Sequence, residues 1–124
     1  MEKITGCILV VMDDFKNVLL LKLKTKRGQD EKWGLISRKL KGKEDCEKCI
    51  EKALKTSIKT LIFDLNKVKE ISINDEENYM MYIGNIKEKP MLDKAYSDYK
   101  WINKNTLSEY NVEEFEKNIL EEIL

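Results

Sequence analysis

The most regular hydrophobic pattern in the chain lies in residues 45–61, where apolar side chains recur every three or four positions. This interval places them on one face of an α-helix, and lysines and glutamates occupy the other face. Asp45 stands where the helix would begin, and its carboxylate can accept hydrogen bonds from the free amides of the first turn. The pattern therefore predicts an amphipathic helix after Asp45, with an apolar stripe of Cys46, Cys49, Ile50, Ala53, Leu54, Ile58 and Leu61.

Three extended segments are predicted before this helix. Residues 4–12 are rich in β-branched and apolar residues, which is typical of a strand that is buried on both faces. In the second half of residues 18–25 leucines alternate with lysines, and a turn rich in Asp and Asn separates this segment from residues 4–12. We therefore expect these two strands to form a hairpin. Residues 33–40 are a shorter strand that precedes a turn with Gly42.

Further strands are predicted after the helix. Residues 59–74 contain one or two strands, and residues 79–86 and 99–102 are rich in β-forming residue types. The side chains of residues 59–74 that we expect to face inward are Val68, Ile71 and Ile73.

The last predicted element is a helix over residues 111–124. Asn111 and Glu114 have the spacing of a capping box, and an apolar stripe follows them. A short helical turn is expected at residues 106–109. Hairpin-linked strands with helices packed outside them indicate an α+β domain.

Composition limits the class of protein. The chain has 124 residues, of which 42% are hydrophobic and 37% charged, so we predict a single domain over residues 1–124 with its own core. Basic and acidic residues balance at 23 each, so no nucleic acid and no membrane is expected as a partner. No apolar segment approaches the length of a membrane span, and the start does not resemble a signal peptide. Together with an odd number of cysteines, three, this predicts a cytoplasmic protein with reduced thiols.

The sequence contains no histidine. This excludes Ser-His-Asp and Cys-His catalysis, zinc sites with histidine ligands, and a histidine general base. Any catalysis would have to come from carboxylates, lysine, tyrosine or cysteine.

Several short motifs and the order of elements resemble the Nudix (MutT-like) family. The motifs are W-G-L at residues 33–35, G-K-E at residues 42–44, the helix that follows, and Trp101 before the terminal helix. The resemblance covers nearly the whole chain and implies a Nudix-type α-β-α sandwich with a mixed sheet. It also implies hydrolysis of nucleoside diphosphate derivatives, with Mg²⁺ or Mn²⁺ as cofactor if the protein is active.

The Nudix signature, G-x5-E-x7-R-E-U-x-E-E-x-G-U with U a bulky aliphatic residue, is only partly kept. Its first glutamate falls on Glu44, its arginine falls on Lys52 as a partial match, and an aliphatic residue is kept at Leu54. The remaining signature positions depart from the family pattern, and they are Arg38, Ala53, Thr56, Ser57, Lys59 and Thr60.

The departures concern the metal ligands. Nudix enzymes hold the metal with helix glutamates, and hard cations need several oxygen ligands, usually carboxylates. Ala53 has no ligand atom, while Thr56 and Ser57 offer neutral hydroxyls. We therefore predict a binding or interaction domain that has lost its metal ligands, with Glu44 and Lys52 as remnants of the catalytic motif. The alternative is an active pyrophosphohydrolase with other metal ligands, for which loop acids are available at Glu70, Asp75, Glu76 and Glu77.

The resemblance also implies where a ligand would bind. In Nudix proteins the region around Trp33 lines the substrate cleft, which predicts a site for a nucleotide-like small molecule. The residues of this predicted site are Lys22, Lys24, Trp33, Arg38 and Lys39. Ordinary surface lysines and core aromatics, including Tyr79, Tyr82 and Trp101, are the simpler interpretation. The stripe of the terminal helix packs on its own sheet or on a second copy, so the protein is expected to be a monomer or homodimer.

Cys46 and Cys49 form a C-x-x-C motif at the predicted start of the helix, where the helix dipole would stabilise a thiolate. Thioredoxin-like chemistry would need a βαβ frame, which is not predicted, and zinc would need four ligands although Cys7 is the only further candidate sulfur. We interpret these cysteines as small core residues.

Overall fold

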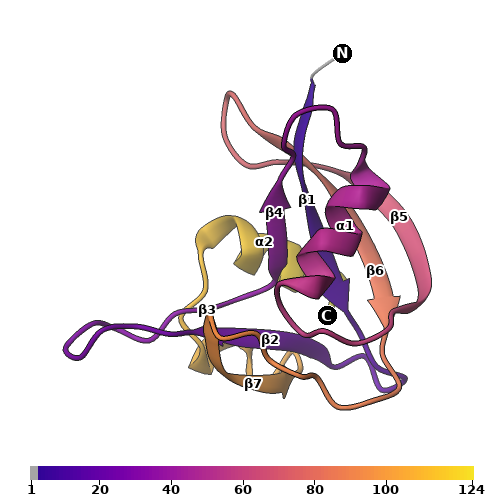
Figure 1. Ribbon diagram of the computed structural model, residues 1–124. Helices are drawn as coiled ribbons and strands as arrows, with labels where there is room; N and C mark the ends of the chain where they lie inside the picture. Colours follow the sequence, from indigo (N-terminus) through magenta and orange to yellow (C-terminus); the bar gives the residue numbers. More distant parts are fainter. Residues whose placement is uncertain (1–2) are drawn as a thin grey trace.

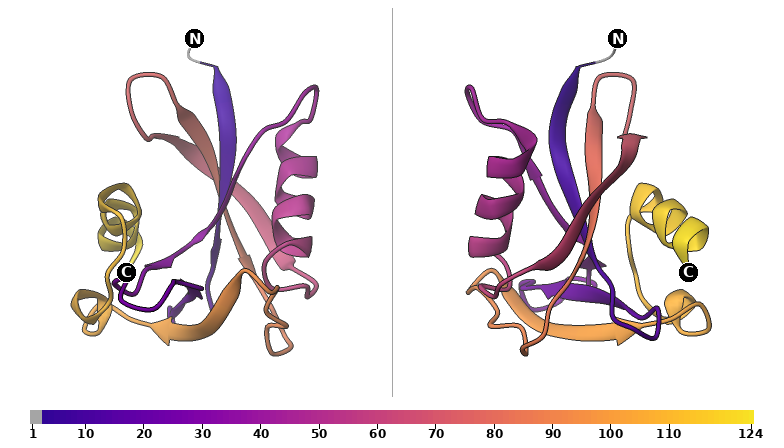
Figure 2. Two further views of the ribbon diagram at one scale, coloured as in Figure 1. Left: turned by 60° about the vertical axis from the view of Figure 1, so that its left-hand side comes forward. Right: turned by 90° about the vertical axis from the view of Figure 1, so that its right-hand side faces the viewer.

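A four-stranded mixed sheet lies between the two helices, as Figures 1 and 2 show for residues 3–124, which the computed structural model describes. β1 and β6 are parallel, and the other neighbours in this sheet are antiparallel. The strand order is β4 (Ile36–Lys39), β1 (Ile4–Val11), β6 (Asn78–Asn85) and β5 (Phe63–Ser72). Helix α1 (Cys46–Lys55) covers one face and helix α2 (Glu114–Ile123) covers the other. The predicted α-β-α sandwich with a mixed sheet is thus confirmed.

A second, antiparallel sheet lies across one end of the first (Figure 1). Its strands are β3 (Trp33–Gly34), β2 (Val18–Leu23) and β7 (Tyr96–Ile102), with β2 in the middle. The short 3-10 turn η1 (Leu107–Glu109), which was predicted, connects β7 to the segment before α2. No helix within residues 3–124 is long and apolar enough to cross a membrane.

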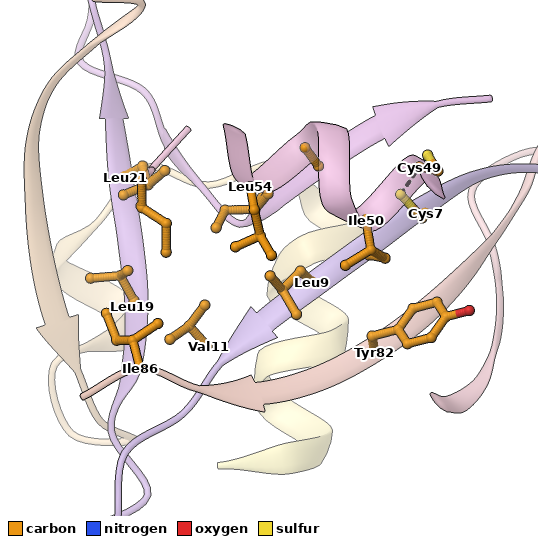
Figure 3. Close-up of a cluster of buried hydrophobic side chains, with 13 residues drawn as sticks. Cys7, Leu9, Val11, Leu19, Leu21, Cys49, Ile50, Leu54, Tyr82 and Ile86 are labelled. Atoms are coloured by element: carbon orange, nitrogen blue, oxygen red, sulfur yellow. Dashed lines mark hydrogen bonds between the residues drawn. The ribbon is translucent and has the colours of Figure 1, made fainter. Parts of the chain in front are cut away.

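Strand β1 lies at the centre of the core and is buried on both faces, as its largely apolar sequence predicted. Successive side chains of a strand point to opposite faces, so β1 contributes side chains to two separate apolar clusters. Cys7 and Leu9 join the cluster beneath α1, which Figure 3 shows, whereas Ile8 and Val10 join the cluster beneath α2. All four are essentially inaccessible to solvent.

The predicted hairpin between residues 4–12 and 18–25 is wrong. Strand β1 pairs with β4 along one edge and with β6 along the other, so it has no edge left for β2. The two segments share a single bridge, between Met12 and Val18, before β2 enters the second sheet. The predicted strand over residues 33–40 likewise divides between the two sheets, as β3 and β4.

Both helices differ from their predicted ends. The Oδ1 atom of Asp45 accepts a hydrogen bond from the Lys48 amide at 2.9 Å, which confirms the N-cap of α1. The helix ends at Lys55, however, and Leu61 is 75% exposed. The capping box of α2 is wrong, because its N-cap residue, Glu113, makes no capping bond through its side chain.

Strand β5 is an edge strand and is largely exposed. Val68, which was expected to face inward, is 44% exposed, so this prediction is wrong. Ile71 and Ile73 are half-buried against the cluster beneath α2, as expected. The difference arises because β5 contributes only the end near its turn with β6 to the core.

Candidate functional site

Three charged side chains meet where β4, the turn after it and α1 come together. Glu44, in the turn, accepts two hydrogen bonds from the guanidinium of Arg38, with Nη1–Oε2 at 2.6 Å and Nη2–Oε1 at 3.3 Å. Lys52, on α1, donates to Oε1 at 3.1 Å. The Arg38 hydrogen bonds, followed by those of Lys52, lower the pKa of Glu44 to about 2. Glu44 is therefore an ion-paired carboxylate that is already neutralised by two cations.

The hydroxyls next to this cluster are directed back onto α1. Thr56 Oγ1 donates to the Lys52 carbonyl at 2.9 Å, and Ser57 Oγ donates to the Ala53 carbonyl at 2.6 Å. Ser57 is fully buried. Side chains of this kind often satisfy carbonyls one turn earlier in a helix, so here they complete the end of α1.

These residues do not fit a divalent metal ion. Mg²⁺ and Mn²⁺ are held by several oxygen ligands, and carboxylates supply most of the charge. The helix positions offer Ala53 and two hydroxyls that bond to backbone carbonyls, while Glu44 already pairs with Arg38 and Lys52. Within residues 3–124 no three Cys, Asp or Glu side chains are grouped so that they could hold a metal ion. Of the loop acids named as alternative ligands, Glu77 pairs with Lys39 and accepts a hydrogen bond from Asn74.

A cavity of about 520 Å³ lies on the opposite face of the first sheet, beside α2. Trp33 forms part of its wall and stacks edge-to-face on Tyr110, with ring centroids 5.0 Å apart. The backbone amide of Trp33 donates to the Asn111 carbonyl at 2.9 Å, which ties β3 to the segment before α2. Other residues that line the cavity are Lys32, Lys39, Tyr79, Tyr96 and Phe115. Glu77, Glu113 and Glu116 line it as well, and Lys39 pairs with Glu77 at 3.7 Å, so aromatic side chains and charges of both signs surround the cavity.

A buried carboxyl group faces this cavity. Glu116 of α2 is 8% exposed, and its Oε2 accepts a hydrogen bond from the backbone amide of Leu35. Burial raises the pKa of Glu116 to about 7, and the Leu35 hydrogen bond only partly offsets this. The approach depends on Gly34, because a Cβ atom there would lie 2.9 Å from Glu116 Oε2. The cavity thus contains a group that changes charge near neutral pH.

The residues predicted to form one ligand site are found in different places. Trp33 and Lys39 line the cavity. Arg38 lies on the α1 face with Glu44 and Lys52, because successive side chains of β4 alternate between the two faces of the sheet. Lys22 forms an ion pair with Glu31 at 2.8 Å, and Lys24 lines a separate depression beside residues 25–32.

The aromatic candidates also separate. Tyr79 lines the cavity, whereas Tyr82 is buried in the cluster beneath α1 and Trp101 is half-buried at its edge. Glu116 was not among the predicted site residues. The sequence does contain a signal for it, since an acidic residue interrupts the apolar stripe of residues 112–123 on the side that faces the sheet.

The comparison with known proteins rests on structure. No protein-family model matches the sequence, and no curated protein matches it. Solved structures, in contrast, superpose along almost the whole chain.

Three of these structures illustrate the similarity. A MutT protein from work on Aliivibrio salmonicida and Vibrio cholerae aligns over 97% of this chain and 95% of its own, with a TM-score of 0.78 and 11% identity. The MutT Nudix hydrolase of Burkholderia pseudomallei aligns over 99% of this chain and 100% of its own, with a TM-score of 0.69 and 16% identity. The Nudix domain of Shewanella oneidensis NrtR, solved with ADP-ribose, aligns over 98% and 86%, with a TM-score of 0.67 and 14% identity.

Identities of this size carry information about the fold rather than about the reaction. The strand order, the two covering helices and the superpositions agree on one architecture. This chain has the Nudix fold.

Proposed function

We propose that this protein is a single Nudix-fold domain that binds a nucleotide-like ligand and lacks the metal-dependent pyrophosphohydrolase activity typical of that fold. In this proposal the cavity beside α2 is the ligand site, and the protein acts as a monomer or homodimer without nucleic acid. The α1 region, with its charge cluster, serves the stability of the domain.

The observation that carries the proposal is that the side-chain oxygen atoms next to the two ends of α1 already have hydrogen-bond partners. The oxygens of Thr56 and Ser57 are used in hydrogen bonds to helix carbonyls, and Glu44 is used by two cations. A metal ion would have to break these bonds and would gain a single carboxylate in return. Without the ion there is no activated water and no neutralisation of a diphosphate leaving group.

The residues that line the cavity support this ligand class. Its aromatic side chains can stack on a base, and Lys32 and Lys39 can approach phosphate oxygens. A similar domain, that of S. oneidensis NrtR, was solved with ADP-ribose. The cavity volume of about 520 Å³ falls within the range of small-molecule sites.

The first experiment tests the missing metal chemistry. Mg²⁺ and Mn²⁺ are titrated into the protein by calorimetry, and phosphate release is measured with a panel of nucleoside diphosphate derivatives. We expect neither metal binding at millimolar concentration nor turnover. Metal-dependent turnover would overturn the proposal in favour of an active pyrophosphohydrolase with other ligands.

A gain-of-ligand variant sharpens this experiment. Ala53→Glu, Thr56→Glu and Ser57→Glu together restore the three lost acids of the signature and should create measurable Mn²⁺ affinity. Ala53 and Ser57 are buried, so circular dichroism must first show that the variant is folded. If the triple variant does not fold, Thr56→Glu alone can be tested instead, because Thr56 is exposed. This single variant should bind Mn²⁺ more weakly than the triple variant.

The second experiment tests the cavity. Trp101→Phe leaves Trp33 as the single tryptophan, whose fluorescence then reports on binding of ADP and ADP-ribose. We expect quenching that saturates, and Lys39→Ala should weaken binding about tenfold, the effect of one charge-assisted hydrogen bond. Lys41→Ala, an exposed lysine outside the cavity lining, is the matched control and should leave the affinity unchanged. An absence of quenching at millimolar nucleotide would contradict the proposed ligand class.

A further inference from the structure

Two cysteines face each other across the interface between β1 and α1, and the proposed function uses neither. Cys7 and Cys49 are both fully buried, and their sulfur atoms lie 2.6 Å apart (Figure 3). Cys7 Sγ donates to Cys49 Sγ, which in turn donates to the Arg38 carbonyl at 3.4 Å. The two thiols and one carbonyl form a hydrogen-bonded row under the first turns of α1.

The separation of the two sulfurs is unusually short for reduced thiols. Nonbonded carbon atoms, which are smaller than sulfur, keep about 3.5–4.0 Å apart, whereas a covalent S–S bond measures about 2.04 Å. The pair at 2.6 Å is therefore nearer to bonding distance than to ordinary contact distance. The two sulfur atoms therefore already lie side by side in the folded protein.

We propose that Cys7 and Cys49 are a redox site, oxidised by a hydroperoxide such as hydrogen peroxide to a disulfide that links β1 to α1. One sulfur attacks a peroxide oxygen, the O–O bond breaks, and water leaves, which produces a sulfenic acid. The second sulfur attacks the first, the S–S bond forms, and a second water leaves. The two thiols lose two electrons and two protons in total, and the peroxide is reduced to two molecules of water.

The C-x-x-C partner of Cys49 takes no part in this bond. Cys46 is half-buried, lies at the start of α1, and forms no hydrogen bond with either cysteine within residues 3–124. Cys49 instead points across to Cys7 on the neighbouring strand, as Figure 3 shows. The disulfide predicted from this geometry joins residues 42 positions apart rather than three.

Burial sets the conditions for the reaction. It raises the pKa of the Cys7 thiol well above its ordinary range, and the neighbouring Cys49 raises it further. Because the thiolate is the reactive form and neither sulfur is exposed, oxidation requires transient opening of the first turns of α1. The two thiols should consequently stay reduced under mildly oxidising conditions and should form the disulfide only during sustained exposure to an oxidant.

The disulfide would stabilise the fold. A bridge that closes a loop of this length restricts the unfolded chain strongly, so the oxidised protein should melt about 10 °C higher than the reduced protein. Oxidation also removes the hydrogen that Cys49 donates to the Arg38 carbonyl, directly beneath the bond between Arg38 and Glu44.

The test uses the full chain treated with hydrogen peroxide, then denatured and alkylated with N-ethylmaleimide. Intact mass should show one alkylated cysteine instead of three, and peptide mapping should show a crosslink between the peptides that contain Cys7 and Cys49. Cys46→Ser should form the same crosslink with the same rise in melting temperature. Cys49→Ala should form no intramolecular bond and should show no rise.

Two results would overturn the proposal. They are alkylation of all three cysteines after oxidation, and a crosslink between Cys46 and Cys49 in place of the one between Cys7 and Cys49. If Cys49→Ala does not fold, Cys7→Ala serves in its place, because a buried cysteine behaves as a small apolar residue and its replacement removes the same sulfur pair.

Discussion

At the scale of single residues, Glu116 is the most unusual side chain of the domain. It is a carboxyl group within an apolar stripe, it receives one hydrogen bond from the Leu35 amide, and burial raises its pKa to about 7. In the unfolded chain the same group titrates near 4.5. The folded state therefore binds the proton more tightly than the unfolded state.

This difference makes a prediction for Glu116→Gln. Stability contributed by a raised carboxyl pKa is fully present below pH 4.5 and is lost as pH rises through about 7, in total about 3 kcal/mol. The glutamine side chain keeps an acceptor for the Leu35 amide but carries no charge. We expect the variant to be more stable than the parent at pH 8 and similar to it at pH 4.5, measured by urea unfolding. An equal difference at both pH values would show that ionisation of Glu116 is not the cause.

At the scale of elements, the end of α1 carries a backbone conformation that its sequence does not favour. Lys59 has a φ angle of +49°, and its amide donates to the Leu54 carbonyl at 3.0 Å. Glycine usually occupies such a position after a helix, and the Nudix signature has glycine here. A residue with a Cβ atom costs about 1 kcal/mol in this region.

We predict that Lys59→Gly stabilises the protein and that Lys59→Ala does not. Both variants remove the exposed ion pair between Lys59 and Asp93, whose atoms lie 3.4 Å apart, so its loss cancels in the comparison. Only glycine relieves the backbone strain. The Lys59→Gly protein should therefore melt several degrees above the Lys59→Ala protein, measured by calorimetry. Equal melting temperatures would mean that the left-handed conformation costs nothing here.

At the scale of the whole molecule, opposite shifts of two carboxyl groups determine how stability depends on pH. The pKa of Glu44 is lowered to about 2 by Arg38 and Lys52, and those of Glu31, Glu77 and Asp93 are lowered by their own partners. Stability from a lowered pKa is present above the unfolded value and is lost as pH falls through the folded value. Glu116 acts in the opposite direction at higher pH.

The two effects together predict a maximum of stability near pH 4.5–5, with a fall on either side. On the acid side, stability should fall as the pH decreases towards 2. On the other side, the fall in stability between pH 5 and 7 should disappear in Glu116→Gln. Urea midpoints measured from about pH 2 to 8 check both limbs. A maximum at pH 7 in the unmodified protein would contradict the assignment of the raised pKa to Glu116.

Much of this fold could be predicted from local patterns. The apolar run of residues 4–12 corresponds to the buried strand β1, and the periodic stripe after Asp45 corresponds to α1 with its N-cap. Both patterns are local, because they depend on the two-residue and 3.6-residue repeats of the backbone. The Nudix resemblance then supplied the order of layers.

The candidate site was less predictable. Arg38 and Lys39 are adjacent in sequence, yet they lie on opposite faces of the sheet, and only Lys39 lines the cavity. Glu116 approaches Leu35 from 81 positions away, so no local pattern could pair them, although its place in an apolar stripe was visible. Cys7 and Cys49, 42 positions apart, are a second pair of this kind.

By itself, the sequence determined which segments form elements, which residues begin α1, and which acids are missing from it, because these properties depend on neighbours along the chain. Tertiary structure alone decided that β1 pairs with β4 and β6 rather than β2, that Glu116 is buried beside the cavity, and that two thiols meet. Such contacts depend on which edges and faces remain available once the sheet has assembled. Distant segments compete for these edges and faces, and the outcome cannot be predicted from a local repeat in the sequence.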